Sequence, residues 1–503
     1  QLNGRLQYET TIAQNHNIGA MFVYSEEYWH TRSTGASRND RIHPSTSEIN
    51  AALTNVQSNS GSSASEGLRS YIGRMNYSAY DKYLLEFSFR VDGSSKFIKG
   101  HQYGFFPTVA VGWRFTEEEF LKKYLSSWLS SGKLRASWGK LGDNSGVDRF
   151  EQLETLTAMN YMSSDVVKGF VNKKMINKDL SWEVSTDINV GLDLGFLNNR
   201  LRTEIDFYNR LRTGMNRPSQ MSIHLTGAYS APRANIGDLL NRGLELNLTW
   251  KDKIGNVEYS VNLNGAYNRT VLKEWNEFLS RGWVYLDMPY HFLYVYENNG
   301  IAQTWQDIYN NTPQGLSPGD VIRKDLNGDG IIDGKDKKAY PNIQRDRPTT
   351  TYGITLQAAW KGFDISMLFN GGLGRKDFWL TDFNNTAFAD RRYASTWDHW
   401  TEPWSLENRG GEWPRLGTST DRSDNSYWLY NMNYLRMKNI MLGYNLPKKL
   451  LSKISMTNLR IYASAENLFT VTQYPGLDPE KKNSARDLYP INRSFSIGLN
   501  VSF

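Results

Sequence analysis

The chain has 503 residues, a formal net charge of +6 and no cysteine. So small a charge for this length, without a stripe of Lys and Arg, argues against a nucleic-acid-binding groove. The lack of cysteine argues against a disulfide scaffold and against Cys-ligated zinc or iron–sulfur chemistry.

Two further properties of the composition bear on a membrane location. Aromatic residues make up 13% of the chain, and membrane barrels use such residues in their interfacial girdles. The mean hydropathy is −0.58, and no segment has the roughly 18 to 20 apolar residues of a membrane helix. These values do not exclude a barrel, because only alternate residues of each barrel strand face lipid.

The start of the chain carries no secretion signal. Residues 1–5 lack the basic start and apolar core of a signal peptide. We therefore expect that the chain has been processed or that the protein begins elsewhere.

Alternation with a period of two recurs along the whole chain and predicts β-strands. Apolar Leu85 and Phe87, for example, alternate with Glu86 and Ser88, so that one face is apolar and the other polar. The predicted strands lie near 3–12, 16–27, 68–79, 82–93, 105–116, 132–140, 184–196, 200–210, 242–251, 257–269, 351–360, 362–370, 433–445, 457–469 and 493–503.

Short turns such as 197–199 and 361–362 alternate with long connections, including 270–350 and an aromatic-rich segment, 371–430. Short turns on one rim and long loops on the other are typical of an all-β, antiparallel transmembrane barrel. A soluble β-sandwich is the alternative, but sandwich strands are usually shorter and such long loops are uncommon. The count of strands is odd, whereas bacterial single-chain barrels have even numbers, so a strand has been missed or the chain is incomplete.

The segment 325–336 reads DLNGDGIIDGKD and fits the calcium-binding loop through its first nine positions. Gly330 permits the sharp turn, while the twelfth position is Asp where an EF-hand has Glu. A structural calcium or magnesium ion is predicted, and an acidic turn without metal is the alternative. The oxygen ligands would come from Asp325, Asn327, Asp329, Ile331 (through its carbonyl), Asp333 and Asp336.

Five tryptophans in the long connection after residue 371 are candidate ligand contacts, because exposed indole rings stack on sugars or peptide side chains. The alternative, which we favour, is an interfacial girdle or packing within the loop. These residues are Trp397, Trp400, Trp404, Trp413 and Trp428.

Nothing in the sequence indicates catalysis. The seven histidines are scattered, and there is neither a Gly-x-Ser-x-Gly elbow nor a Walker loop. Charged residues on alternating strand faces are explained by a hydrated, selective lumen.

Several segments together resemble the SusC-like branch of the TonB-dependent transporters of Bacteroidetes. The run 80–97, YDKYLLEFSFRVDGSSKF, is the most characteristic. The others follow in the order of the family: YGFFP at 103–107, GWR at 112–114, KLRASWG at 133–139, GFLNNRL at 195–201, NIG at 235–237, NRGLE at 241–245, YLRMKNI at 434–440, GYNLP at 443–447 and AENLF at 465–469.

The resemblance extends over nearly all of residues 1–503 and implies the C-terminal part of a barrel of about 22 strands. It implies that a plug domain, a TonB-binding segment and the first strands precede Gln1 in the family. Because an open sheet edge in lipid leaves backbone groups unpaired, the strand near 3–12 is expected to pair with a segment outside this chain. The terminal Phe503 corresponds to an aromatic assembly signal in similar barrels.

The function implied by the resemblance is active import of a nutrient, an oligosaccharide or a peptide, across the outer membrane. TonB would act through the plug segment, and a SusD-like surface lipoprotein would cap the barrel. Two alternatives belong to other classes: a passive porin, which conducts without TonB, and a soluble glycan-binding or glycan-cleaving β-protein, which stays soluble without detergent.

Overall fold

The computed structural model describes the chain apart from a set of segments, of which 379–401 is the longest. The residues outside the description are 41, 53–56, 126–127, 163–165, 173–174, 223, 225–230, 278–284, 291, 379–401, 416–424, 452–455, 482–489 and 503.

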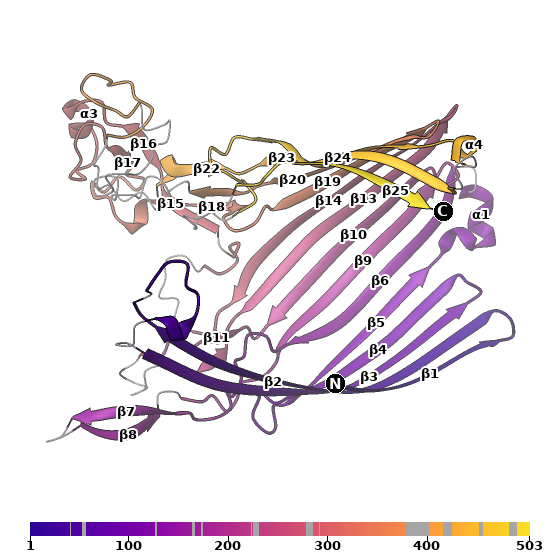
Figure 1. The fold of residues 1–503 in the computed structure, drawn as a ribbon, viewed down its shortest axis with the longest axis horizontal. Helices are drawn as coiled ribbons and strands as arrows, with labels where there is room; N and C mark the ends of the chain where they lie inside the picture. The colour runs from indigo at the N-terminus through magenta and orange to yellow at the C-terminus, as the bar shows by residue number, and fades with distance from the viewer. Residues whose placement is uncertain are drawn as a thin grey trace.

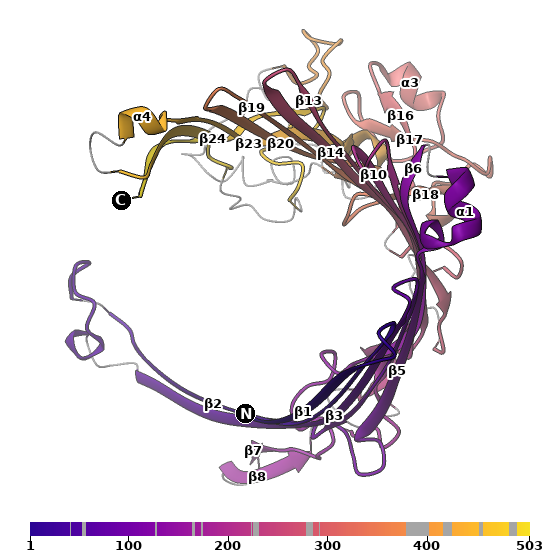
Figure 2. The ribbon, with the colours of Figure 1, turned by 90° about the vertical axis from the view of Figure 1, so that its right-hand side faces the viewer.

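Fifteen strands form one antiparallel sheet in which each strand pairs with its neighbours along the chain. Figures 1 and 2 show this sheet as an open, strongly curved arc. β1 and β25 stand at the two ends of the strand order, and among the described residues no ladder joins them. The strands are β1 (Leu2–Ile12), β2 (His16–Arg38), β3 (Gln57–Ala79), β4 (Tyr83–Ser94), β5 (Tyr103–Trp113), β6 (Leu129–Asp143), β9 (Glu183–Phe196), β10 (Leu201–Thr213), β13 (Asp238–Ile254), β14 (Val257–Glu274), β19 (Thr350–Trp360), β20 (Phe363–Leu373), β23 (Tyr434–Asn445), β24 (Asn458–Thr472) and β25 (Ser494–Ser502).

The register of these ladders aligns the apolar positions of successive strands into one face. Val190 lies opposite Phe207, Phe207 opposite Leu244, and Leu244 opposite Tyr267, and all four side chains are exposed. Since directly opposed residues of an antiparallel pair share a face, the alternation seen in the sequence becomes a continuous apolar surface, with the polar residues behind it.

The two rims of the sheet differ in the length of their connections. On one rim the strands are joined by turns at 13–15, 80–82, 197–200, 255–256 and 361–362, or by short helical segments. These segments are η2 (Phe115–Glu117), α1 (Glu119–Leu125) and α4 (Lys448–Leu451). At the turn 197–199 all three residues have positive φ, which suits the Asn pair better than the leucine before it.

The opposite rim carries the long connections, which contain short elements of their own (Figure 1). They are η1 (Ile49–Ala51), β7 (Leu156–Met162), β8 (Val166–Asn172), β11 (Asn216–Pro218), β12 (Arg233–Asn235), β15 (Phe292–Tyr296), β16 (Asn298–Ile301), α3 (Trp305–Tyr309), β17 (Val321–Arg323), η3 (Gly334–Asp336), β18 (Lys337–Gln344), β21 (Lys376–Phe378), η6 (Ser426–Trp428) and β22 (Leu429–Asn431). None of the helices in the described part of the chain has the length and apolar character needed to cross a membrane.

The fifteen predicted strands are confirmed as the fifteen strands of the sheet, and the sandwich alternative is wrong, because these strands form one curved layer. The largest error concerns the hairpin of β2 and β3, because both strands are longer than predicted. The prediction has the first strand end near residue 27 and the second begin near residue 68. The ladder continues to the pair Arg38 and Gln57. This outer part is rich in Ser, Thr and Gly on both faces, so it lacks the apolar alternation that marks a strand in a sequence.

Candidate functional site

Ion pairs that cross from strand to strand line the polar face of the sheet. Arg135 on β6 donates to Asp193 on β9 at 2.7 Å and to Asp206 on β10 at 2.9 Å. Arg74 pairs with Glu86 at 2.8 Å. Arg74, Glu86 and Arg135 also line a hollow of about 830 Å³. The polar face therefore holds charges of both signs, which balance one another while they remain hydrated.

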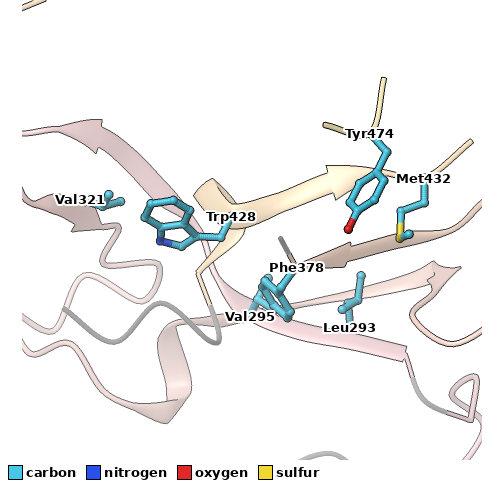
Figure 3. Packing of buried hydrophobic residues seen from close by; sticks show 7 residues of the cluster. All are labelled: Leu293, Val295, Val321, Phe378, Trp428, Met432 and Tyr474. Atoms are coloured by element: carbon cyan, nitrogen blue, oxygen red, sulfur yellow. The ribbon is translucent and has the colours of Figure 1, made fainter. Parts of the chain in front are cut away.

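At the long-loop rim, three connections fold together into a unit that we call the loop module. It comprises the described parts of 275–349, 374–433 and 473–493. Its apolar core draws residues from all three connections (Figure 3). Burial in this module raises the pKa of Tyr430 to about 12. The core residues are Leu293, Val295, Val321, Phe378, Trp428, Met432 and Tyr474.

Polar contacts also join the first two of these connections. Asp320 accepts from Arg415 at 2.8 Å, and Ser426 Oγ accepts from the amide of Asn298 at 2.9 Å. The indole of Trp404 donates to Gln303 at 2.9 Å. Residues about 95 to 128 positions apart are thus held in contact, so the loop module is folded like a small globular domain.

Two buried arginines hold the third connection in place, one from the second connection and one from the sheet. Arg375, after β20, donates to the carbonyls of Pro479, Glu480 and Lys481 at 3.0 to 3.1 Å. Arg436, on β23, donates to Asp478 at 2.8 Å and also pairs with Glu480. Both arginines are only 2% exposed, so their charges are compensated inside the protein by these acceptors.

Arg436 faces the same side of the sheet as the polar residues. It lies opposite Asn370 on β20 and Thr470 on β24, and Asn370 also donates to Glu480 at 3.0 Å. The segment 478–481 therefore lies against the polar face rather than over the outer surface.

The arginine-bound segment and the loop core were missed by the sequence analysis. The only signal was the acidic run Asp478-Pro479-Glu480, which by itself looks like an ordinary polar turn.

Three of the five candidate tryptophans lie in the described part of the loop module, and two do not. Trp428 is 2% exposed and lies in the loop core, and Trp404 is 7% exposed. Trp413 is partly buried and packs against the same core. For these three the packing alternative fits their position, because their rings are buried or partly buried within the loop module. Trp397 and Trp400 lie outside the described residues.

The segment 325–336 forms a compact turn in the loop module. Gly328 and Gly330 have φ of +74° and +80°, a conformation that a residue with a Cβ adopts only with strain. Asp325 accepts from the amides of both glycines, at 2.6 and 2.9 Å. Burial would raise the pKa of the Asp325 carboxyl, but these amides and the Thr312 hydroxyl outweigh it, so its pKa lies below the usual range.

The remaining predicted ligands are held by similar bonds. The side chain of Asn327 accepts from the amide of Asp329, and that of Asp329 accepts from the amide of Ile331. Asp336 is fully buried and accepts from the amides of Leu326 and Asp333, both at 2.9 Å. Within the residues that the structure describes, no three acidic or histidine side chains are arranged to hold a metal ion. The donor set is that of a hard cation, and binding of the cation stays a prediction.

Comparisons with known proteins agree with this architecture. The family "TonB dependent receptor-like, beta-barrel" matches residues 1–314. TonB-dependent receptor P3 of Formosa agariphila is 30% identical over 476 residues, which cover 87% of this chain and 45% of that receptor. TonB-dependent receptor SusC of Bacteroides thetaiotaomicron is 30% identical over 456 residues, or 87% and 44% of the two chains. The chain thus spans about half the length of the curated relatives it matches.

Among solved structures, the RagAB peptide transporter superposes on this chain with a TM-score of 0.83 at 23% sequence identity. The superposition covers 100% of this chain and 55% of the transporter chain. At this identity the likeness shows the fold. The relatives are receptors rather than enzymes. Their family places the apolar face of the sheet in lipid and the polar face toward the lumen. The chain belongs to the TonB dependent receptor-like β-barrel family of the outer membrane and is similar to its SusC members.

Proposed function

We propose that the protein to which this chain belongs imports a nutrient actively across the outer membrane. The observation that carries the proposal is the pairing of a continuous polar face, rich in balanced ion pairs, with a folded loop module at its extracellular end. A lumen lined in this way hydrates a polar solute, and the ordered loops offer a shaped entrance. Because the chain belongs to the TonB-dependent receptor family, we infer that the energy for import comes from TonB, which pulls on a plug segment.

The proposed substrate is an oligosaccharide or a peptide, captured together with a SusD-like surface lipoprotein. Two comparisons support these classes. One relative is named SusC, and the similar solved structure is titled a peptide transporter. The mixed charges of the polar face suit a zwitterionic peptide as well as a neutral sugar, so both classes are tested.

The experiment measures uptake of labelled oligosaccharides and labelled peptides by cells that carry the full-length transporter. Uptake that requires both the transporter and TonB supports the proposal and identifies the substrate class. Uptake that persists without TonB, together with steady conductance of the purified full-length protein in planar bilayers, would instead establish a passive porin.

For the segment 325–336 we propose a structural calcium ion, with magnesium as the weaker alternative. The proposal is supported by the oxygen-rich sequence and by the positive φ of Gly328 and Gly330, which close the turn. Asp325, Asn327, Asp329, Asp333, Asp336 and the Ile331 carbonyl would hold the ion, which would order this part of the loop module and the docking surface for the lipoprotein.

The test compares the full-length protein with and without a chelator, and with Asp325→Ala/Asp329→Ala. Calcium binding measured by calorimetry, and faster hydrogen exchange in 325–336 after either treatment, are expected. The barrel should stay folded and retain its heat-dependent gel migration. Absence of calcium binding with unchanged exchange would leave an acidic turn without metal.

A further inference from the structure

The helix α1, in the connection between β5 and β6, lies on the convex side of the sheet at the short-turn rim (Figure 2). Phe120 and Tyr124 are 64% and 74% exposed, although both are large and aromatic. Residues four positions apart share one face of a helix, so the two rings project together. Leu121 and Leu125 are partly buried, which turns the aromatic pair away from the sheet.

One side chain, that of Glu118, fastens the start of α1 to the sheet. It accepts from the hydroxyl of Tyr83 at 2.6 Å and from the indole of Trp113 at 3.2 Å, and it pairs with Lys82 at 3.4 Å. Its backbone carbonyl accepts from the amide of Lys122 at 2.8 Å in the first turn of the helix. Tyr83 and Trp113 are direct cross-strand partners. The helix therefore begins at a point fixed by two strands.

Tyr83 and Trp113 belong to the apolar face, because Trp113 lies opposite Leu134 and Leu134 lies opposite Leu192. Just before β6 the chain contacts the same face again, since the ring of Trp128 stacks on that of Phe196 with 5.8 Å between centroids. The exposed aromatic face of α1 thus continues the surface of the barrel that contacts lipid, at the level where its strands end.

The helix also carries two exposed lysines, Lys122 and Lys123, in its last turn. Lys122 pairs with the carboxylate of Glu117 at 3.9 Å, and both side chains are more than half exposed, so this pair is weak. The two ammonium groups are therefore available to an external anion. Aromatic rings beside lysines on a short helix at the edge of an apolar surface are the pattern of a helix lying in the membrane interface.

We propose that α1 is an in-plane anchor in the periplasmic leaflet of the outer membrane. Phe120 and Tyr124 insert at the boundary between headgroups and acyl chains, while Lys122 and Lys123 bind the phosphates of phospholipid headgroups. The occupant of this surface is phospholipid rather than a protein partner, because the face is continuous with the lipid-facing side of β5, β6 and β9. The anchor fixes the depth of the barrel where these strands end.

Spin labels in the full-length transporter, reconstituted in vesicles of phosphatidylethanolamine and phosphatidylglycerol, test the insertion. The 503 residues contain no cysteine, so Tyr124→Cys introduces one defined site into them. Ser62→Cys, on the exposed outer part of β3, is the aqueous control. A spin label at residue 124 should collide more often with oxygen than with a water-soluble nickel complex. A spin label at residue 62 should collide more often with the nickel complex. Nickel access at 124 equal to that at 62, or low access to both reagents, which indicates cover by protein, overturns the proposal.

A second measurement tests the headgroup contact. Phosphatidylglycerol retained by the purified transporter is counted by native mass spectrometry for Lys122→Glu/Lys123→Glu and for a matched pair on the opposite rim, Lys99→Glu/Lys324→Glu. The α1 variant should lose bound lipid while the matched variant keeps the number found for the unaltered protein. Equal retention by the two variants refutes phosphate binding by α1.

Discussion

The sheet and the loop module are stabilised in different ways, although they are parts of one chain. In the sheet, long ladders satisfy the backbone, and the apolar side chains face outward, where Leu244 and Phe207 remain exposed until lipid covers them. In the loop module the apolar residues face inward, around Trp428, and Arg375 is buried among the carbonyls that accept its hydrogen bonds. The sheet thus exposes its apolar side chains and pairs its backbone, as a membrane protein does, whereas the module buries its apolar side chains, as a globular domain in water does.

This difference means that equivalent substitutions should have opposite consequences in the two regions. Removing a buried charge partner or an apolar side chain should damage the module, whereas the sheet should be sensitive to polarity on its lipid face. Four predictions follow this contrast.

The largest effect is expected for Arg436→Met, which leaves Asp478 and Glu480 without their main cation. Breaking a buried ion pair costs about 3–5 kcal/mol. Limited proteolysis should cut within 473–481 at temperatures at which heat-dependent gel migration still reports a folded barrel. Arg69→Met is the control, since the pair of Arg69 and Glu26 is well exposed on the sheet, where water and salt screen the attraction. Equal protease resistance of the two variants would show that the arginine contributes little.

Leu293→Ala should destabilise the loop module by roughly 2–5 kcal/mol, because it opens a cavity in the core. Hydrogen exchange should accelerate in peptides that contain Met432 and Tyr474, which reach the core from the other two connections. Leu406→Ala, at an exposed position of the same module, should stay within about 0.5 kcal/mol. Faster exchange confined to the peptide around residue 293 would mean that the three connections do not fold as one unit.

On the sheet, Leu246→Arg should destabilise the barrel by about 2–4 kcal/mol, since residue 246 lies midway along β13 on the lipid face. Asn247→Arg, one residue further and beside Glu204 on the polar face, should be close to neutral. Urea unfolding of the full-length protein in bilayers measures both. A larger loss for the second variant would reverse our assignment of the two faces.

The smallest effect is expected for Asp336→Asn in the 325–336 turn. The amide cannot accept all the backbone hydrogen bonds of the buried carboxylate, and leaving amides unpaired costs roughly 1–3 kcal/mol. Local hydrogen exchange should rise in this turn and nowhere in the sheet. Ile331→Ser, whose side chain is exposed, is the control and should leave exchange unchanged. When both variants are measured without added cation, the difference in exchange gives the contribution of the Asp336 hydrogen bonds alone.

The strands could be predicted because each carries its own signal. The alternation of Leu85 and Phe87 with Glu86 and Ser88 is dictated by the lipid on one side of the strand and water on the other, and it is visible within ten residues. The outer half of the hairpin of β2 and β3 lacked this signal, because water surrounds both of its faces. The turn 325–336 was recognised for a similar reason: its glycines and oxygens are neighbours in the sequence.

By itself, then, the sequence determined the strands, their order, the lipid face and the oxygen-rich turn, because each depends on interactions between residues close along the chain. Only the tertiary structure decided which loop residues are buried. Leu293, Trp428 and Tyr474 have no common periodicity, and their contact depends on the sheet bringing three connections to one rim. The same holds for Arg436, whose two carboxylate partners lie more than forty residues away. It also holds for α1, whose aromatic face can be assigned to lipid only from its place beside the lipid-facing strands (Figure 2).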